Sequence, residues 1–333
     1  MIKRVLLLLA LVFFTACQKE LVKNQNVGNA LGTTYSIIYI ADEPLDFQQE
    51  IDSVFRVMNQ SLSTYIPTSD ISKINQGDST IVVDHMFQEV FELSKKIHGY
   101  SKGYFDPTVG VLVNAWGFGP GEQIELDNMR VDSLLDYVGF DKVNLTENNT
   151  VRKRSKSIYF DFNAIAKGYA IDRLGAMLDA KGISNYLVEV GGEVLTKGTN
   201  PISQKQWTVG IDDPQAEEGR QLKRIVSLEN KAMASSGNYR KFRIDKKTGM
   251  KYVHTINPKT GYTKNSSVLA TSVVAHTCAE ADAFATAFMA MDLKDSQLLL
   301  EERDELEAYI IYIDEEGKTQ EFMTPGFQHL VQN

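Results

Sequence analysis

Apolar residues recur at intervals of three or four along much of this 333-residue chain, the spacing of a helix with one buried face. Within residues 45–60, for example, Phe47, Ile51, Phe55 and Met58 share one face. The same pattern predicts helices over residues 86–101, 131–138, 164–181, 279–291 and 293–303. A glycine-rich connection without this pattern covers residues 103–121.

Short runs rich in β-branched and aromatic residues predict strands. They cover residues 33–40, 157–161, 186–190, 206–211, 224–228, 241–244, 268–274 and 308–313. Strands crowd together between about residues 184 and 275 instead of alternating with helices. This order favours an α+β fold with mainly antiparallel sheets over a doubly wound parallel sheet. No fixed-period repeat or proline-rich linker divides the chain, so we expect any subdomains to be interleaved.

The first residues have the pattern of a targeting segment. Lys3 and Arg4 precede an apolar run over residues 5–14, which is too short to span a bilayer. Thr15-Ala16-Cys17 follows and resembles a bacterial lipobox, with Phe14 where that pattern usually has leucine. The resemblance implies cleavage before Cys17 and attachment of lipid to its thiol. An ordinary cleaved signal peptide is the alternative.

These features predict a signal peptide over residues 1–16, a polar tether over residues 17–29 and one folded domain over residues 30–333. The expected location is the cell envelope. A lipid would anchor the protein to a membrane, with its catalytic domain in the periplasm.

Charge and cysteine content narrow the possible partners. Loss of Lys3 and Arg4 with the targeting segment takes the formal net charge from −8 to −10. Nucleic-acid binding needs clustered basic residues, so an acidic domain argues against such a partner. With Cys17 lipidated, Cys278 is alone and cannot form an internal disulfide. We expect Cys278 to be a small buried residue, since no histidine base is placed for it by the sequence.

A strand-to-helix junction carries the first candidate site. Asp161 ends an apolar run, and Lys167 lies inside the helix that follows. Backbone amides at such a junction, a cation and a carboxylate can converge on one polar ligand. Gly168 costs the helix roughly 0.5–1 kcal/mol relative to alanine and suggests close approach of a backbone or ligand. An ion pair between Asp161 and Lys167, with Asn163 as helix cap, is an equally open interpretation.

A second candidate site lies on a mostly apolar helix. Asp282 and Thr286 are four residues apart, so both side-chain oxygens lie on one face. A buried carboxylate needs a partner, and Mg²⁺ with oxygen ligands is one solution. Pairing of Asp282 with a basic side chain is the alternative.

His254 is the candidate general base. It precedes a proline-containing turn over residues 256–261, where a strand meets a loop. Histidine titrates near neutral pH and can take a proton from a nucleophile, although a lone histidine is more often structural. The other histidines are expected to be solvated or packing residues: His85, His98, His276 and His329.

Three glycine-rich stretches could bring backbone amides close to a phosphate or a flat ring. They are residues 103–110, Gly191-Gly192 and residues 235–239. None has the spacing of a Walker loop, and no GxGxxG opens a helix after a strand. A Rossmann dinucleotide site is therefore disfavoured.

Taken in order, these stretches resemble the ApbE family, the FAD:protein FMN transferases, which are often bacterial lipoproteins. The likeness covers residues 32–35, 63–65, 105–110, 161–168, 190–192, 235–239, 254–258 and 282–286. It implies an ApbE-like, T-fold-related domain that binds FAD with Mg²⁺ and cleaves its pyrophosphate. FMN would pass to a threonine hydroxyl of an exported redox subunit, with release of AMP.

The resemblance also assigns residues to roles. Catalysis would fall to His254 as base, with Asp282 and Lys167. The metal would be bound by the carbonyls of Ala164 and Ala285 and by the side chains of Asp282 and Thr286. Flavin-nucleotide contacts would come from Leu31, Tyr65, Tyr104, Phe105, Asp106, Asp161, Lys167, Ser236, Gly237 and Ile256.

Three positions depart from the family pattern. Leu31 stands where methionine is common and should keep an apolar contact, because the two side chains have similar volumes. Asn257 and Glu193 each stand where aspartate is usual. Two other activities stay open: an Mg²⁺-dependent FAD pyrophosphatase that yields FMN and AMP, and a flavin-binding lipoprotein without turnover.

Overall fold

The computed structural model describes residues 20–216, 221–238, 242–244, 251–264 and 267–332, without the side chains of residues 242–244 and 251–252. The predicted signal peptide, Cys17 and Tyr239 lie outside these ranges, so cleavage and lipid attachment stay predictions. Within the described ranges, no helix is both long and apolar enough to cross a bilayer.

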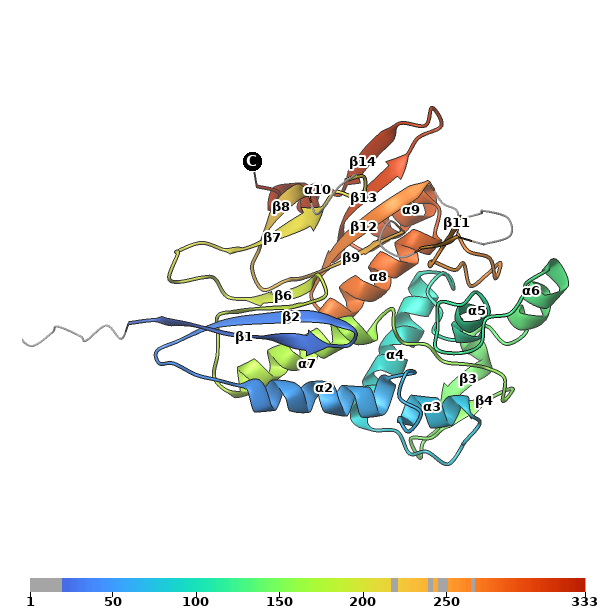
Figure 1. Cartoon of the computed structure of the whole chain (residues 1–333). Helices are drawn as coiled ribbons and strands as arrows, with labels where there is room; N and C mark the ends of the chain where they lie inside the picture. Colours follow the sequence, from blue (N-terminus) through green and yellow to red (C-terminus); the bar gives the residue numbers. More distant parts are fainter. Residues whose placement is uncertain (1–19, 217–220, 239–241, 245–250, 265–266, 333) are drawn as a thin grey trace, which may run out of the picture.

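One eight-stranded sheet forms the centre of the molecule (Figure 1). Its order is β1-β2-β5-β6-β9-β12-β13-β14, and each neighbouring pair is antiparallel. The strands are β1 (Val22–Ala30), β2 (Thr33–Ala41), β5 (Tyr186–Val190), β6 (Glu193–Lys197), β9 (Ala232–Gly237), β12 (Val268–Ala275), β13 (Glu307–Ile313) and β14 (Thr319–Met323). Strands from the start and the end of the chain share this sheet, which confirms the predicted interleaved α+β fold.

Most helices lie on one face of this sheet, and α7 and α8 lie directly against it. The helices are α2 (Gln48–Leu62), α3 (Asp70–Asn75), α4 (His85–Tyr100), α5 (Gly110–Ala115), α6 (Asn128–Leu135), α7 (Ala166–Ala180), α8 (Cys278–Ala290), α9 (Leu293–Glu302) and α10 (Pro325–Leu330), with a 3-10 turn η1 (Phe140–Lys142). The six helices predicted from apolar spacing are therefore confirmed, with ends shifted by a few residues.

The other face of the sheet packs against α10 and a hairpin of β7 (Trp207–Asp212) and β8 (Leu222–Leu228). Val194, Ile211 and Phe327 belong to the apolar cluster between these layers. Two smaller hairpins pair β3 (Val143–Leu145) with β4 (Val151–Lys153), and β10 (Phe242–Ile244) with β11 (Lys251–Val253).

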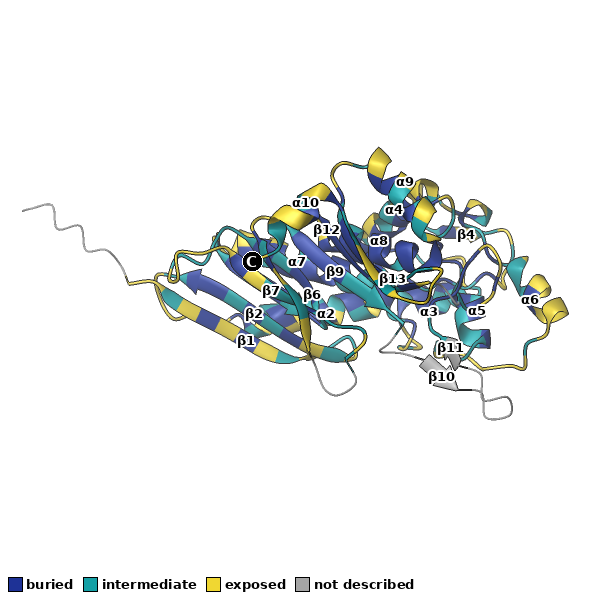
Figure 2. Ribbon diagram, turned by 90° about the horizontal axis from the view of Figure 1, so that it is seen from above, coloured by how far each residue is buried: buried dark blue, intermediate teal, exposed yellow. Residues whose placement is uncertain are grey.

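The prediction of a polar tether is wrong for residues 22–29. These residues form most of β1 and pair with β2 over their whole length. Figure 2 shows buried and exposed residues alternating along β1. Asn24 Oδ1 accepts a hydrogen bond from the Leu45 amide at 2.8 Å, and Asn26 Oδ1 accepts one from the Tyr39 hydroxyl at 2.9 Å. Buried amides with partners let a polar sequence enter a sheet.

Three other local predictions also fail. Residues 157–161 form no strand beyond an isolated bridge from Tyr159 to Val109. The connection over residues 103–121 contains α5. Residues 235–237, predicted as a turn, end strand β9, whose small and hydroxyl side chains carry little apolar pattern. Short strands of this kind are defined by their neighbours rather than by their own sequence.

Gly168 marks the contact between α7 and α8. An added Cβ at this position would lie 2.3 Å from the carbonyl oxygen of Cys278, so the two helix backbones touch here. The close approach expected from Gly168 is thus made by another backbone. Because α8 is almost entirely buried, this contact holds the sheet-covering helices in register.

We expect Gly168→Ala to lower the free energy of unfolding by about 1–3 kcal/mol, because a methyl group cannot fit against the Cys278 backbone. Gly99→Ala is the matched control, because Gly99 is also helical and an added Cβ would meet no other atom. Its free energy of unfolding should rise by up to about 1 kcal/mol. Urea denaturation measures both variants. Equal shifts of the same sign would contradict the packing argument.

Candidate active site

Lys167 lies in the first turn of α7 and forms an ion pair with a residue of the central sheet. Its Nζ is 2.7 Å from Oε2 of Glu193, the first residue of β6. The Gly191-Gly192 turn, with φ of 64° and 103°, brings Glu193 to this place. The ion pair considered between Lys167 and Asp161 is therefore wrong: the partner comes from a strand that the apolar pattern missed.

Asp282 of α8 binds the start of α7. The Gly168 amide lies in the first turn of this helix, where backbone amides have no intrahelical partner, and it donates to Asp282 Oδ2 at 3.0 Å. Among the described residues, the Ala164 carbonyl, just before the helix, accepts no backbone hydrogen bond. The start of α7 thus combines a buried carboxylate with a carbonyl oxygen that has no backbone donor.

The charges of this cluster do not balance. Burial disfavours the ammonium of Lys167, but the carboxylates of Glu193 and Asp282 outweigh that effect and raise its pKa. Burial raises the pKa of Glu193 and of Asp282, and Lys167 lowers both in part. When both carboxyl groups are ionised, they share one ammonium, and a divalent cation would neutralise the excess negative charge.

The other predicted metal ligands lie on α8. Ser236 Oγ, at the end of β9, is 3.5 Å from Thr286 Oγ1. The Ala285 carbonyl, in the interior of α8, accepts a hydrogen bond from Thr271 Oγ1 at 2.8 Å, so its part in metal binding stays a prediction. The described residues contain no group of three His, Cys, Asp or Glu side chains suited to a metal. A metal here would need carbonyl and hydroxyl oxygens, the kind of ligand set that the resemblance implies.

Asp172 fixes the other end of the contact between α7 and α8. Its two carboxylate oxygens accept hydrogen bonds from the amides of Cys278 and Ala279, at 2.7 and 2.9 Å, in the first turn of α8. Burial raises the pKa of Asp172 to about 7. Cys278 is buried, and burial raises the pKa of its thiol well above the ordinary value, so it suits packing rather than nucleophilic attack.

The segment at Asp161 lies beside the loop at Pro107. The Asp161 amide donates to the Pro107 carbonyl at 2.8 Å, and Asp161 Oδ1 accepts from the Asn163 amide at 2.7 Å. The Asn163 side chain does not cap α7, whose N-cap residue is Ile165. Burial raises the pKa of the Asp161 carboxyl.

Tyr65 is an exposed aromatic ring at this edge, with 59% of its surface accessible. Partial burial and then the charge of Asp161 raise the pKa of its hydroxyl, so the two predicted flavin contacts lie near each other. Tyr104 is half-buried, and Lys259 Nζ lies 4.6 Å from the centre of its ring. Tyr65 and Tyr104 offer flat surfaces to a ligand.

The side chains of Phe105 and Asp106 make their contacts with other residues of the protein. Phe105 is buried in the main core. Asp106 accepts hydrogen bonds from the Thr108 amide and hydroxyl and from the Phe140 amide, and its Oδ2 lies 3.3 Å from His98 Nε2. Contact of these two residues with flavin stays a prediction, and it would fall mainly to their backbone. His98, expected to be a packing residue, lies against Phe140 as well.

The segment that carries His254 is docked onto α5 and α6. His254 is half-buried, and Ile256 packs with Leu112 and Val138. The Trp116 indole donates to the Gly261 carbonyl at 2.9 Å. These contacts hold the turn after His254, which is the arrangement that a general base on a loop requires.

Leu31 occupies the β1–β2 turn with a left-handed φ of 51°. A surface depression of about 480 Å³ adjoins it, lined by Asn29, Ala30, Gly32, Thr33 and Thr34. An added Cβ at Gly191 would lie 2.8 Å from Thr33, so this turn lies beside the one that precedes Glu193. The two turns therefore border one surface.

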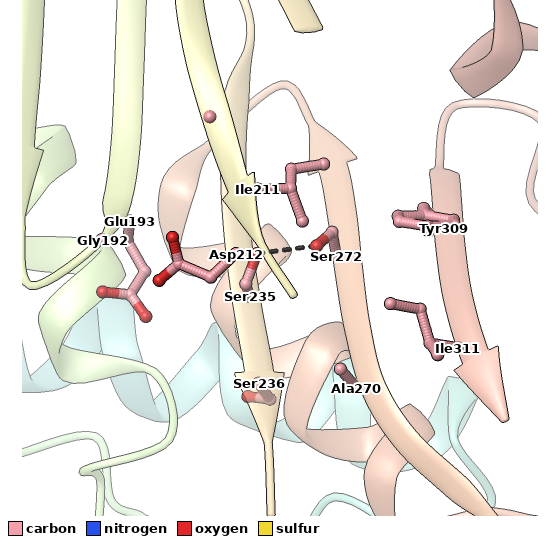
Figure 3. A pocket seen from close by; sticks show the side chains of 11 residues that line it. Gly192, Glu193, Ile211, Asp212, Ser235, Ser236, Ala270, Ser272, Tyr309 and Ile311 are labelled. Carbon is pink, nitrogen blue, oxygen red and sulfur yellow. Dashed lines mark hydrogen bonds between the residues drawn. The ribbon is translucent and has the colours of Figure 1, made fainter. Parts of the chain in front are cut away.

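A small cavity of about 30 Å³ lies on the β7 side of the sheet (Figure 3). Its lining includes Glu193, Asp212, Ser235, Ser236 and Tyr309. Ser235 and Ser272 are hydrogen-bonded across it at 2.8 Å. This space suits about one water molecule rather than a nucleotide.

Three comparisons relate the chain to known proteins. The model of the ApbE family matches residues 31–310. The FAD:protein FMN transferase of Haemophilus influenzae is 32% identical over 315 residues, which cover 91% of this chain and 90% of that protein. The one of Vibrio cholerae is 33% identical over 294 residues, which cover 85% and 86%. The solved structure of the flavin transferase ApbE from Vibrio cholerae superimposes with a TM-score of 0.82 and 31% identity, covering 93% of this chain and 99% of that one.

Burial raises the pKa of Asp172 from 3.8 to about 7, so folding takes up a proton between these values. The resulting stabilisation is fully present below about pH 4 and is lost as pH rises through about 7. The free energy of unfolding of the parent should therefore fall between pH 4 and 7 because of Asp172. In Asp172→Asn this fall should be smaller by about 2–4 kcal/mol.

Urea denaturation at several pH values tests this expectation. Asp141→Asn, at an exposed position, is the control and should keep the parental slope. The same slope in the parent and in Asp172→Asn would contradict the assignment.

Proposed function

The chain belongs to the ApbE family, and from that premise we infer that it is an FAD:protein FMN transferase whose active site surrounds Lys167 and Asp282. The observation that carries the site assignment is the hydrogen bond from the Gly168 amide to Asp282. It joins Asp282 to the start of α7, one residue from Lys167, so a carboxylate and an ammonium from distant segments lie at one helix N-terminus. A pyrophosphate with its metal requires this combination.

We propose Mg²⁺ as the metal, bound by the side chains of Asp282 and Thr286 and the carbonyls of Ala164 and Ala285. Oxygen ligands of mixed type suit this hard cation. The excess negative charge and the Ala164 carbonyl without a backbone donor support the fit. When bound, the metal would neutralise phosphate charge and stabilise AMP as leaving group.

Each of the chain's own groups has a role in the transfer. Lys167 binds the pyrophosphate, and the first-turn amides of α7 add positive partial charge. The threonine Oγ attacks the phosphorus of the FMN half, the bond from that phosphorus to the bridging oxygen breaks, and AMP leaves with that oxygen. The His254 imidazole takes the hydroxyl proton.

The flavin would bind at the surface between the β1–β2 turn and the Tyr104 loop. Tyr65 provides an exposed ring for stacking, and Leu31 and Tyr104, both partly buried against the core, would border the flavin. Ile256 is buried against α5, so its contact would come through its backbone. Ser236 and Gly237 end β9 near Thr286 and would reach the phosphate side.

We propose that the acceptors are threonine-bearing subunits of exported redox complexes and that a lipid on Cys17 anchors the enzyme in the cell envelope. The basis is the targeting segment of the sequence, which lies outside the described residues. A periplasmic catalytic domain would meet such subunits directly.

Asp282→Asn should lower FMN transfer at least about a hundredfold at fixed Mg²⁺, because it removes the charged metal ligand and keeps the side-chain shape. The measurement is FMN attached to a threonine-containing acceptor, by mass spectrometry. Asp314→Asn, on a surface turn, is the control and should transfer at the parental rate. Parental transfer in Asp282→Asn would contradict the metal assignment.

His254→Ala should bind FAD as the parent does but transfer FMN about 10²–10⁴-fold more slowly, since the threonine hydroxyl loses its base. His276→Ala, at an exposed position, is the matched control. Equal transfer rates in parent and His254→Ala would remove His254 as base. AMP release without acceptor, at a rate equal to transfer, would instead support the pyrophosphatase alternative.

A further inference from the structure

The central sheet has a gap beside the active site. Strands β6 and β9 are paired only at Val194 with Met233 and at Leu195 with Ala232. The pairing stops before Glu193, whereas β9 continues along β12 to Gly237, and Glu193, Ser235 and Ser236 line the small cavity between them. Figure 3 shows Glu193 on one side of this gap and Ser235 and Ser236 on the other.

Glu193 lies in the gap and is only 4% exposed. The turn before it is fixed, because the Gly192 amide donates to Glu189 Oε1 at 2.6 Å. Its Oε2 is 2.7 Å from Lys167 Nζ, and no other described group donates to that oxygen. Glu193 is therefore a buried carboxylate on a fixed turn, and Lys167 is the described partner of its Oε2.

Lys167 is different in this respect. Its side chain is 29% exposed and has a flexible four-carbon stem. Holding that stem in one conformation costs up to about 2 kcal/mol of conformational entropy. An ammonium has three N–H donors, so one can turn to Glu193 while two remain for phosphate oxygens. The fixed partner can thus orient the mobile one.

We propose that Glu193 is a positioning residue that holds the Lys167 ammonium in place for the pyrophosphate during transfer. This proposal rests on the function inferred above for Lys167. A carboxyl group beside the proposed phosphate site cannot attract the phosphates of FAD, so Glu193 adds nothing directly to the ground-state binding of FAD. Its effect therefore falls on the rate of transfer rather than on FAD affinity.

Glu193→Gln tests the proposal because it keeps the size of the side chain and removes the charge. We expect kcat for transfer to fall about ten- to a hundredfold, while the Kd for FAD, from flavin fluorescence, changes less than about threefold. Glu193→Asp keeps the charge but shortens the reach, and it should recover part of the rate. Parental kcat in Glu193→Gln, or equal losses in kcat and FAD affinity, would overturn the proposal.

Glu50→Gln is the matched control. Glu50 pairs with Lys181, directly after the other end of α7, so the variant removes the same charge from a lysine partner outside the site. It should leave both kcat and Kd at parental values. A loss of kcat like that of Glu193→Gln would show a general effect on α7 and would overturn the proposal.

A double-mutant cycle separates this proposal from the function it rests on. If Glu193 acts through Lys167, Lys167→Met combined with Glu193→Gln should be no slower than Lys167→Met alone. Additive losses would overturn the positioning role and leave the role of Lys167 intact. Parental AMP release by Lys167→Met, in the presence of acceptor and Mg²⁺, would overturn the pyrophosphate role of Lys167 and this proposal with it.

Discussion

Reciprocal contacts between two helix N-termini underlie the site. Asp282 of α8 accepts the Gly168 amide in the first turn of α7, and Asp172 of α7 accepts the Cys278 and Ala279 amides in the first turn of α8. Each helix thus binds a carboxylate of the other where its amides lack intrahelical partners. Gly168 allows this because only a residue without Cβ lets the backbones touch. The position of Lys167 follows from this contact.

The same contacts explain the electrostatics of the site. Carboxylates this deep cost free energy unless they are paired and hydrogen-bonded. Asp172 has its two amides, but Asp282 and Glu193 share Lys167. Ionisation of both carboxyl groups is a cost in the free protein and would attract the proposed cation. Stability and function thus oppose each other at this cluster, as is common where binding groups are concentrated.

Local patterns predicted the long elements well. Helices α2, α4, α7 and α8 follow from apolar spacing, because each buries one face or all of its surface. Strand β1 was missed because its buried polar residues take partners from elsewhere in the chain. Strands β6 and β9 were missed because short strands are stabilised mainly by their neighbours. The ion pair considered for Lys167 therefore involved the near carboxylate, Asp161, and not Glu193.

The sequence by itself determined the α+β class, the family resemblance and the candidate catalytic residues, since residue type and spacing are local properties. Only the tertiary structure decided which carboxylate meets Lys167, which amide binds Asp282 and that Asp106 is occupied within the protein. These are contacts between segments far apart in the chain. Their geometry depends on strand pairing and helix packing, which no single segment specifies.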